Sequence, residues 1–218
     1  MALLNIREIN PATYLGFWEI SETAESLRNA LQDLTSCQLV IPEFASASRQ
    51  KQWLSSRILV YTLLQNFTAA YFPLQTSAAG KPIFPEEKYQ VSITHSHTLV
   101  GVILAKGHKV GIDIEIISPK VMRVVDKFMC GPEIEDAGGN LEKTLVYWSA
   151  KETLYKLYSK KKLIFKDHLL VEPFALHNTG ALTTLVKTPG TENTFTVYYE
   201  HLNGYILTYC VSELNDII

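Results

Sequence analysis

Residues 110–116 alternate strictly between apolar and other side chains (VGIDIEI), and this alternation predicts a β-strand. Successive side chains of a strand point to opposite faces, so Gly111, Asp113 and Glu115 share one face and the branched apolar residues share the other. Two carboxylates two residues apart repel each other unless a cation lies between them. The stretch therefore predicts a strand that presents an acidic face to a ligand or to a neighbouring element.

A second stretch, residues 142–158, predicts a long helix with a carboxylate in its apolar stripe. Steps of four, three, four and three place on one helical face Leu141, Leu145, Trp148, Glu152 and Tyr155. Glu152 is therefore expected to point inward, as Asp113 and Glu115 do. Taken singly, such acids are more often solvent-facing or part of surface ion pairs. Taken together, three inward carboxylates predict a site for a hard divalent cation with oxygen ligands, Mg²⁺ in the first place.

The bulk composition excludes several classes of protein. Hydrophobic residues at 47% and charged residues at 19% of 218 are typical of a globular chain with one large domain or two small ones. The net charge of −2 gives no reason to expect nucleic-acid binding. We expect neither a signal peptide nor a membrane span, because the N-terminus and the apolar stretches lack those patterns. The distant Cys37, Cys130 and Cys210 form neither a metal pair nor a disulfide framework, so a cytoplasmic protein is expected.

The remaining patterns predict strands and helices in alternation. Helices are expected at residues 21–34, 49–71 and 121–130, and strands at residues 14–20, 91–94, 99–104, 181–187, 194–201 and 205–211. Asn203 and Gly204 should form the hairpin turn between the last two strands. Lysines gather after the second long helix, as a solvated helix end or as a landing patch for an acidic partner; they are Lys156, Lys160, Lys161, Lys162 and Lys166.

The sequence contains a weak internal repeat with an offset of 95 residues (111 − 16 = 95). Gly16 falls on Gly111 and Trp53 falls on Trp148, each time on the same type of predicted element, which argues for a duplication. We therefore predict an α+β fold: two similar α/β halves packed as a pseudo-dimer, each with a small antiparallel sheet and a long helix.

Only the second half keeps the acids of the expected site. At the same offset Arg57 takes the place of Glu152 (152 − 57 = 95). The C-terminal half, residues 89–218, would hold the cation, in a cleft between the halves. The N-terminal half, residues 1–88, would hold the anion that the cation binds, through Arg57, Arg49 and Lys51.

Basic residues complete a set that suits a pyrophosphate, namely Lys81, His95, Arg57, Lys151 and Lys156. Lys81 leaves a Gly-Lys-Pro turn, where most lysines are simply exposed. His95 lies between two strands, where a histidine is more often structural than a phosphate ligand. Glu133 follows a Gly-Pro helix break, and its ordinary interpretation is a favourable charge in the first turn of a helix.

These residues together resemble the 4′-phosphopantetheinyl transferase superfamily, in its monomeric Sfp type with two similar halves. Its motif Gly-(Ile/Val)-Asp-x-Glu corresponds to residues 111–115, Phe-x-x-x-x-Glu to residues 128–133, and Trp-x-x-Lys-Glu-x-x-x-Lys to residues 148–156. Its Gly-Lys-Pro element corresponds to residues 80–82, and its Ser-His-Ser element to residues 94–96. Thr94 stands where the family has serine. Any one motif is weak, but their combined order and spacing is specific.

The resemblance implies transfer of the 4′-phosphopantetheine group of coenzyme A to a serine of an acyl or peptidyl carrier protein, with release of adenosine 3′,5′-bisphosphate. It places Mg²⁺ on Asp113, Glu115 and Glu152. It makes Glu133, Glu152 and Lys156 catalytic, with Glu133 or a metal-bound water taking the serine proton; Glu135 is a second candidate for the position of Glu133. The phosphates of coenzyme A would be held by Arg49, Arg57, Lys81, His95, Lys151 and Lys156.

Two other functions are compatible with the sequence. A catalytically degenerate module would bind coenzyme A or a carrier protein without transfer, although the intact acids and Lys156 speak against it. An unrelated metal-dependent phosphohydrolase would need a base that positions water, for which the sequence offers Glu133 at best. In each case we expect a monomer with pseudo-twofold symmetry that binds neither nucleic acid nor membrane.

Overall fold

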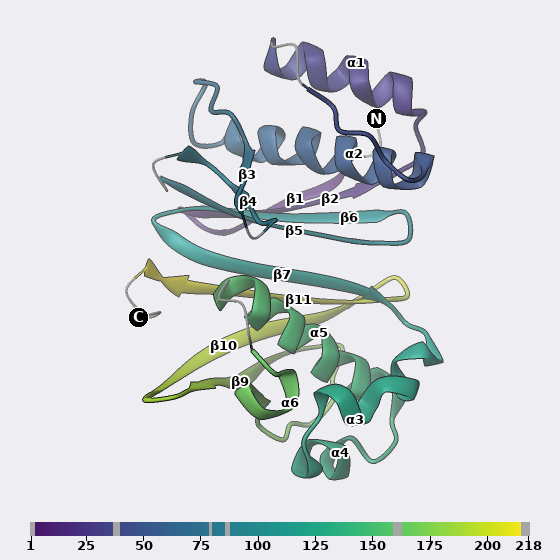
Figure 1. Cartoon of the computed structure of the whole chain (residues 1–218), viewed down its shortest axis with the longest axis vertical. Helices are drawn as coiled ribbons and strands as arrows, with labels where there is room; N and C mark the ends of the chain where they lie inside the picture. The colour runs from purple at the N-terminus through teal and green to yellow at the C-terminus, as the bar shows by residue number, and fades with distance from the viewer. Residues whose placement is uncertain (1–2, 37–39, 79, 86–87, 159–162, 215–218) are drawn as a thin grey trace. The chain divides into compact units, whose positions relative to one another are not determined.

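A computed structural model describes residues 3–36, 40–78, 80–85, 88–158 and 163–214 of the chain. It divides into two compact units, Met1–Gly107 and His108–Ile218 (Figure 1). Each unit contains one main antiparallel sheet and one long helix that packs on it. This arrangement confirms the predicted α+β class with two similar halves.

The sheet of the first unit has the strand order β1-β2-β6-β5, and all neighbours pair antiparallel. Its strands are β1 (Leu3–Asn10), β2 (Thr13–Glu19), β5 (Tyr89–Ser96) and β6 (Leu99–Lys106), and a small second sheet consists of β3 (Gln75–Thr76) and β4 (Pro82–Ile83). Helix α2 (Ala47–Leu64) packs on β2, β5 and β6, and α1 (Ala24–Thr35) packs on α2.

The boundary between the units lies later than the predicted one between residues 88 and 89. Strand β6 pairs with β2 along its whole length, and β5 pairs with β6. A cut after residue 88 would remove both strands from the sheet to which they belong. The division therefore follows Gly107.

The sheet of the second unit has the order β7-β11-β10-β9-β8, again with antiparallel neighbours. Its strands are β7 (His108–Ile116), β8 (Leu169–Val171), β9 (Thr179–Thr188), β10 (Thr191–Leu202) and β11 (Tyr205–Glu213). The helices are a 3₁₀ helix η2 (Pro119–Val124), α3 (Val125–Phe128), α4 (Gly131–Ala137), α5 (Leu141–Tyr158) and α6 (Phe165–His168). Helix α5 packs on β7, β10 and β11.

The two units follow the same path through their sheets. In the first unit β2 pairs with β6, which pairs with β5, and α2 covers these three strands. In the second unit β7 pairs with β11, which pairs with β10, and α5 covers these three. Both long helices have 18 residues. Shifted by 95 residues, β2 falls on β7 and α2 falls on α5, so these two pairs of elements support the predicted duplication, whereas β6 falls on β10 rather than on β11.

The two equivalent glycines lie where a long helix passes close to a strand. A β-carbon on Gly16 would come within 2.9 Å of Leu59 Cδ1, whereas one on Gly111 would overlap with the backbone carbonyl oxygen of Thr153. A leucine methyl group can move by a change of side-chain rotamer, but a backbone carbonyl group of a helix can move only if the helix moves. Glycine is therefore needed most at residue 111, next to the acidic face of β7.

Gly111→Ala is expected to destabilise the protein by about 3 kcal/mol, near the upper end for overpacking, because β7 and α5 must separate. Gly16→Ala is the matched control, and it should cost only about 1 kcal/mol because leucine side-chain ends relax. Urea unfolding of the two variants measures the difference. Equal losses of unfolding free energy in the two variants would show that α5 shifts as easily as a leucine side chain.

Several predicted elements differ from the structure in their ends. Helix α2 ends at Leu64 rather than at residue 71, and Tyr61 Oη accepts a hydrogen bond from the returning chain at Leu74 N (3.1 Å). Helix α1 is capped by Thr23, whose hydroxyl accepts from Ser26 N. The predicted helix 121–130 consists of η2 and α3. The elements that the sequence did not predict are β1, β3, β4, β8, α4 and α6. Gly131 and Pro132 begin α4, since proline fits the first turn of a helix.

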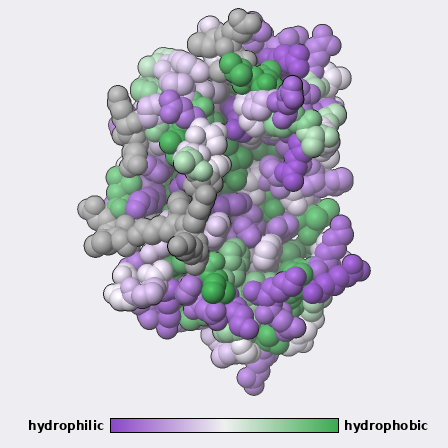
Figure 2. All heavy atoms as spheres, in the orientation of Figure 1, coloured by the Kyte–Doolittle hydropathy of each residue, from purple (hydrophilic) through white to green (hydrophobic). Residues whose placement is uncertain are grey.

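The predicted hairpin turn between β10 and β11 is confirmed. Asn203 and Gly204 have φ angles of 46° and 86°, the left-handed pair that a two-residue hairpin turn requires. No helix among the described residues is long and apolar enough to cross a membrane. On the face shown in Figure 2, hydrophobic groups are interspersed with hydrophilic ones.

Candidate active site

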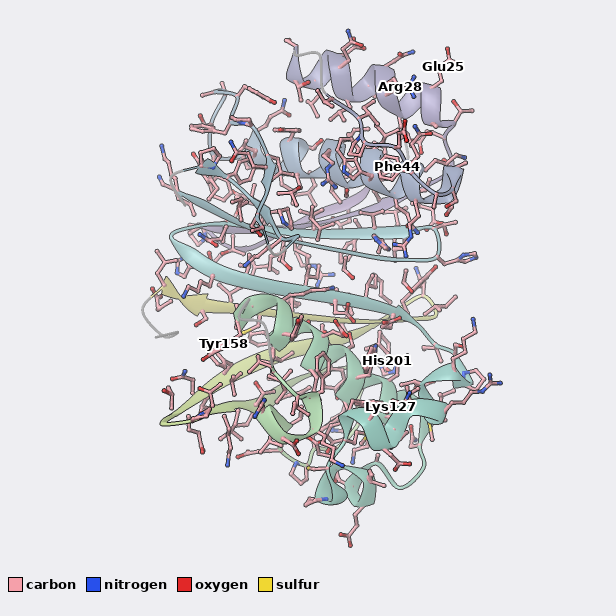
Figure 3. All side chains as sticks on the ribbon, viewed as in Figure 1. Glu25, Arg28, Phe44, Lys127, Tyr158 and His201 are labelled. Carbon is pink, nitrogen blue, oxygen red and sulfur yellow. The ribbon has the colours of Figure 1, made fainter. Side chains whose placement is uncertain are left out.

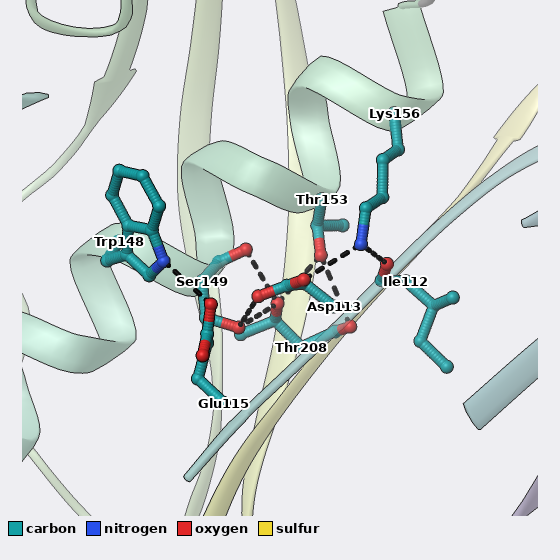
Figure 4. A network of polar contacts seen from close by, with 8 residues as sticks. All are labelled: Ile112, Asp113, Glu115, Trp148, Ser149, Thr153, Lys156 and Thr208. Atoms are coloured by element: carbon teal, nitrogen blue, oxygen red, sulfur yellow. Dashed lines mark hydrogen bonds and ion pairs between the residues drawn. The ribbon is translucent and has the colours of Figure 1, made fainter. Parts of the chain in front are cut away.

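The acidic face of β7 lies against α5, as the alternation predicts. Asp113 Oδ2 accepts a hydrogen bond from Ser149 Oγ (2.9 Å), and Glu115 Oε1 accepts one from Trp148 Nε1 (2.9 Å) (Figure 4). Gly111, on the same face, leaves room for the backbone of α5. The close approach of the strand and the helix thus brings both acids of β7 to the middle of α5.

Lys156 pairs with the deeper of these acids. Its Nζ donates to Asp113 Oδ1 (2.8 Å) and to the carbonyl oxygen of Ile112 (2.9 Å). The Asp113 side chain is 5% exposed and the Lys156 side chain 27%. Both carboxylate oxygens of Asp113 therefore hold a hydrogen bond, while part of the lysine remains open to solvent.

Glu152 lies on α5 between Trp148 and Lys156 and interacts electrostatically with the acids of β7. Burial raises its pKa to about 7, and the negative charges of Asp113 and Glu115 add to this rise while Lys156 opposes it. Burial likewise raises the pKa of Glu115, and the charge of Asp113 contributes. The charge of Asp113 thus disfavours the ionised forms of Glu115 and Glu152.

The three acids fit the chemistry of a hard divalent cation. They offer oxygen donors only, and a cation between them would relieve their mutual repulsion. Among the residues that the structure describes, no three His, Cys, Asp or Glu side chains are grouped as a ready metal-ligand cluster. The Mg²⁺ site on Asp113, Glu115 and Glu152 therefore stays a prediction.

Aromatic side chains hold Trp148 in place. Its ring packs edge-on against Phe128 (5.0 Å between centroids) and stacks on Phe165 (5.7 Å), which also contacts Tyr155 (5.4 Å). Such packing fixes the direction of the indole N–H, which donates to Glu115. Trp148, which the sequence placed in the apolar stripe and in a family motif, thus contacts one of the acids directly.

Glu133 and Lys151 form a buried ion pair with each other. Lys151 Nζ donates to Glu133 Oε2 (2.6 Å) and to the carbonyl oxygens of Phe128 (2.7 Å) and Phe165 (3.4 Å), and its side chain is 0% exposed. Glu133 also accepts from the backbone N–H groups of Cys130 and Val171, both at 2.9 Å.

This pair bears on two of the predicted roles, which stay predictions. All three donors of the Lys151 ammonium point at internal acceptors, so in this conformation it cannot hold a phosphate. Glu133 is enclosed by three donors and is 2% exposed, so in this conformation its carboxylate is not open to another protein. Burial lowers the pKa of Lys151, and Glu133 opposes this shift. Glu135, the second candidate for the base, is exposed on α4.

The predicted phosphate ligands of the N-terminal half all lie in the first unit. Arg49 Nη1 and His95 Nε2 are 3.4 Å apart, so these two side chains come together. Lys51 lines a pocket of about 260 Å³ with Ile20, Ala47, Ser48, His97 and Thr98. Lys81 is half-buried, and its backbone N–H bonds Ser77 Oγ (3.1 Å).

Arg57 is held in a stack. Its guanidinium lies 4.2 Å from the ring centroid of Trp53, which also contacts Phe44. Phe44 is labelled in Figure 3. Arg57 Nη1 donates to Ser56 Oγ (3.0 Å), and burial lowers the pKa of Arg57 to about 10. The arginine is therefore engaged within its own unit, whereas Arg49 is exposed.

Several residues named in the sequence analysis lie outside the described part of the chain. They are Cys37, Lys160, Lys161 and Lys162. Cys130 is half-buried and Cys210 is buried. The hydroxyls of Ser149, Thr153 and Thr208 contact the site and were missed, because no local pattern in the sequence brings β11 next to Asp113.

Two family models match the chain, one in each unit. The model of the 4′-phosphopantetheinyl transferase superfamily matches residues 109–210, which contain all three acids and Lys156. The chain belongs to the 4′-phosphopantetheinyl transferase superfamily. The model of the 4′-phosphopantetheinyl transferase N-terminal domain matches residues 28–105. The two domains fit the monomeric Sfp type, and the family indicates a transferase of the phosphopantetheinyl kind. No curated protein matches the chain.

Proposed function

We propose that this superfamily member transfers 4′-phosphopantetheine from coenzyme A to a serine of an acyl or peptidyl carrier protein, with Mg²⁺, and releases adenosine 3′,5′-bisphosphate. The observation that carries the proposal is that Asp113 and Glu115 face α5, the helix that carries Glu152, beside the partly exposed Lys156. It lies within the range that the superfamily model matches. Mutually repelling acids next to an ammonium suit a substrate that brings both a cation and a diphosphate.

Asp113, Glu115 and Glu152 would hold the Mg²⁺ ion. When bound, the ion neutralises negative charge on the diphosphate. Lys156 Nζ donates a hydrogen bond to Asp113 Oδ1. Its stem is partly exposed, so the ammonium can turn toward a phosphate oxygen while the backbone carbonyl of Ile112 retains it at the site. Lys156 would then stabilise the charge that develops on the transferred phosphate.

The transfer forms a bond between the serine oxygen and the phosphorus next to the pantetheine arm. The bond from that phosphorus to the bridging oxygen breaks, and the electron pair leaves with the adenosine 3′,5′-bisphosphate. The serine proton needs an acceptor, and Glu152 suits this role better than Glu133. Glu152 lies beside Asp113 and Lys156, whereas Glu133 pairs with Lys151 in the core.

Basic residues of the first unit would hold the remaining phosphates. Arg49 and His95 lie together and Arg49 is exposed, so they are the first choice for the 3′-phosphate of coenzyme A. Lys81 would add a charge near the diphosphate. Arg57 is the weaker candidate because Trp53 and Ser56 already engage its guanidinium.

The test is to incubate the purified chain with coenzyme A, Mg²⁺ and an apo-carrier protein, and to weigh the carrier by mass spectrometry. We expect the carrier to gain the mass of one phosphopantetheine group, and the gain to vanish with EDTA or with a carrier whose acceptor serine is alanine. No gain with any of several carriers, together with tight Mg²⁺-independent binding of coenzyme A, would favour a degenerate module. Hydrolysis of coenzyme A without a carrier would favour a phosphohydrolase.

A further inference from the structure

Three buried hydroxyls form a continuous chain that ends on Asp113 (Figure 4). Thr153 Oγ1 lies 2.7 Å from Thr208 Oγ1, which lies 2.9 Å from Ser149 Oγ. Ser149 Oγ in turn lies 2.9 Å from Asp113 Oδ2. All three hydroxyl residues are 0% exposed. The chain joins α5, which carries Ser149 and Thr153, to β11 and β7.

The proton count gives this chain a direction. An ionised carboxylate only accepts, so Ser149 must donate its single hydroxyl proton to Asp113. In the hydrogen bond between Ser149 and Thr208 the donor must then be the Thr208 hydroxyl. In the one between Thr208 and Thr153 the donor must be the Thr153 hydroxyl. Thr208 Oγ1 also lies 2.9 Å from the Ser149 carbonyl oxygen, and Thr153 Oγ1 lies 3.2 Å from the Thr208 carbonyl oxygen. Each threonine hydroxyl proton is therefore shared between a neighbouring hydroxyl oxygen and one of these carbonyl oxygens.

The strand register places Thr208 next to the acid that it supports. Thr208 on β11 and Asp113 on β7 are direct partners in the antiparallel ladder, so their side chains lie on the same face of the sheet. Lys156 holds Asp113 Oδ1 from one side, and the hydroxyl chain holds Oδ2 from the other. The plane of the carboxylate is thus determined by two charge-assisted hydrogen bonds from different elements.

We propose that Thr208 and Ser149 are positioning residues that set the orientation of Asp113 for cation binding, with Thr208 acting through Ser149. This consequence rests on the proposed function, in which Asp113 is a metal ligand. Packing alone does not require the hydroxyls, because apolar residues of the same shape fill such a core about as well. Hydroxyls that lead from the core to a single carboxylate are the arrangement by which proteins orient metal ligands.

Thr208→Val tests the proposal because valine keeps the shape of threonine and removes the hydroxyl. In the presence of coenzyme A, Mn²⁺ affinity is measured by the electron paramagnetic resonance signal of the free ion. We expect Thr208→Val to weaken Mn²⁺ binding about tenfold, the usual size of an effect on a metal from beyond its direct ligands. Thr208→Ser, which restores the hydroxyl, should bind Mn²⁺ like the wild type.

Thr184→Val is the matched control. Thr184 is also 0% exposed and lies in the same sheet, but its hydroxyl donates to the Phe195 carbonyl oxygen (2.9 Å). Both valine variants should lower the unfolding midpoint to a similar extent, whereas only Thr208→Val should weaken Mn²⁺ binding. Equal Mn²⁺ affinities in the two variants and the wild type would overturn the proposal.

A metal-free measurement separates this proposal from the proposed function. The ¹³Cγ resonance of Asp113 should shift in Thr208→Val and stay in place in Thr184→Val. If Thr208→Val does not fold, Ser149→Ala removes the donor to Asp113 directly and should shift the same resonance. A wild-type protein that binds no Mn²⁺ would contradict the proposed function, and the resonance would still decide whether the hydroxyls hold Asp113. An unmoved resonance would show that they do not.

Discussion

Glu152→Gln is expected to lower the rate of phosphopantetheine transfer by roughly a thousandfold or more, because metal-ion stabilisation is worth several kcal/mol in the transition state. The substitution keeps the shape of the side chain and removes one of the three charges that would bind the cation. The rate is measured as the mass gain of a carrier protein at saturating coenzyme A. A loss below tenfold would show that Glu152 neither binds the metal nor takes the proton.

The same substitution should leave the metal-free protein at least as stable as the wild type. The folded-state pKa of Glu152 is raised from 4.5 to about 7, so the folded protein holds a proton that the unfolded chain releases. The wild type therefore loses stability relative to Glu152→Gln as the pH rises from about 4.5 to about 7, and the gap stays constant above that range. Urea unfolding in EDTA across this pH interval measures the gap.

Glu142→Gln is the matched control for the loss of a carboxylate on α5. Glu142 Oε2 lies 3.1 Å from His201 Nε2, and its side chain is 47% exposed. His201 is labelled in Figure 3. Transfer should proceed in this variant at nearly the wild-type rate, because an exposed pair contributes little and lies outside the acid cluster. A comparable loss of activity in both variants would point to a general effect on the helix.

Lys151→Met is expected to destabilise the second unit by about 3–5 kcal/mol, the cost of leaving a buried charge without its partner. Glu133 would keep its two backbone donors but lose the ammonium at 2.6 Å. The loss is measured as a shift of the urea unfolding midpoint of the full chain. Adding Glu133→Gln should recover part of the stability, since no charge is then left in the core.

Lys143→Met is the matched control on the same helix. Its ammonium pairs with Asp136 Oδ2 at 2.8 Å, but the side chains are 13% and 21% exposed, so water can replace the lost contact. We expect a loss of about 1 kcal/mol. If Lys151→Met is as mild as Lys143→Met and abolishes transfer without unfolding, Lys151 contacts substrate and the structural role assigned to it is wrong.

The sequence predicted the elements whose patterns are local. The two-residue period of residues 110–116 determined which side chains of β7 face α5, and the contacts of Asp113 and Glu115 agree with it. The Gly16 and Gly111 correspondence predicted two similar halves, and the close approach of a helix to each glycine is its physical reason. Periodicity reports such features because a helix or strand repeats its geometry at every turn or pair of residues.

The boundaries and the missed elements depend on contacts that are distant in the sequence. The apolar residues beyond Leu64 continue the pattern of α2, but Tyr61 bonds the returning chain at Leu74 and the helix ends. Strand β8 has only three residues and forms by pairing with β9. The division after Gly107 follows from the pairing of β6 with β2. No local period carries this information.

The sequence by itself determined that acids of a strand and of a later helix meet beside lysines, because the residue types and their spacing place them on facing surfaces. Only the tertiary structure decided which lysine forms an ion pair with an acid of the site. Lys151 and Lys156 stand five residues apart, which on a helix is about 140° around the axis. Lys151 therefore points to Glu133 in the core and Lys156 to Asp113 at the site. The partners come from α4 and β7, and their positions are set by the packing of whole elements, so the motif could not distinguish the two roles.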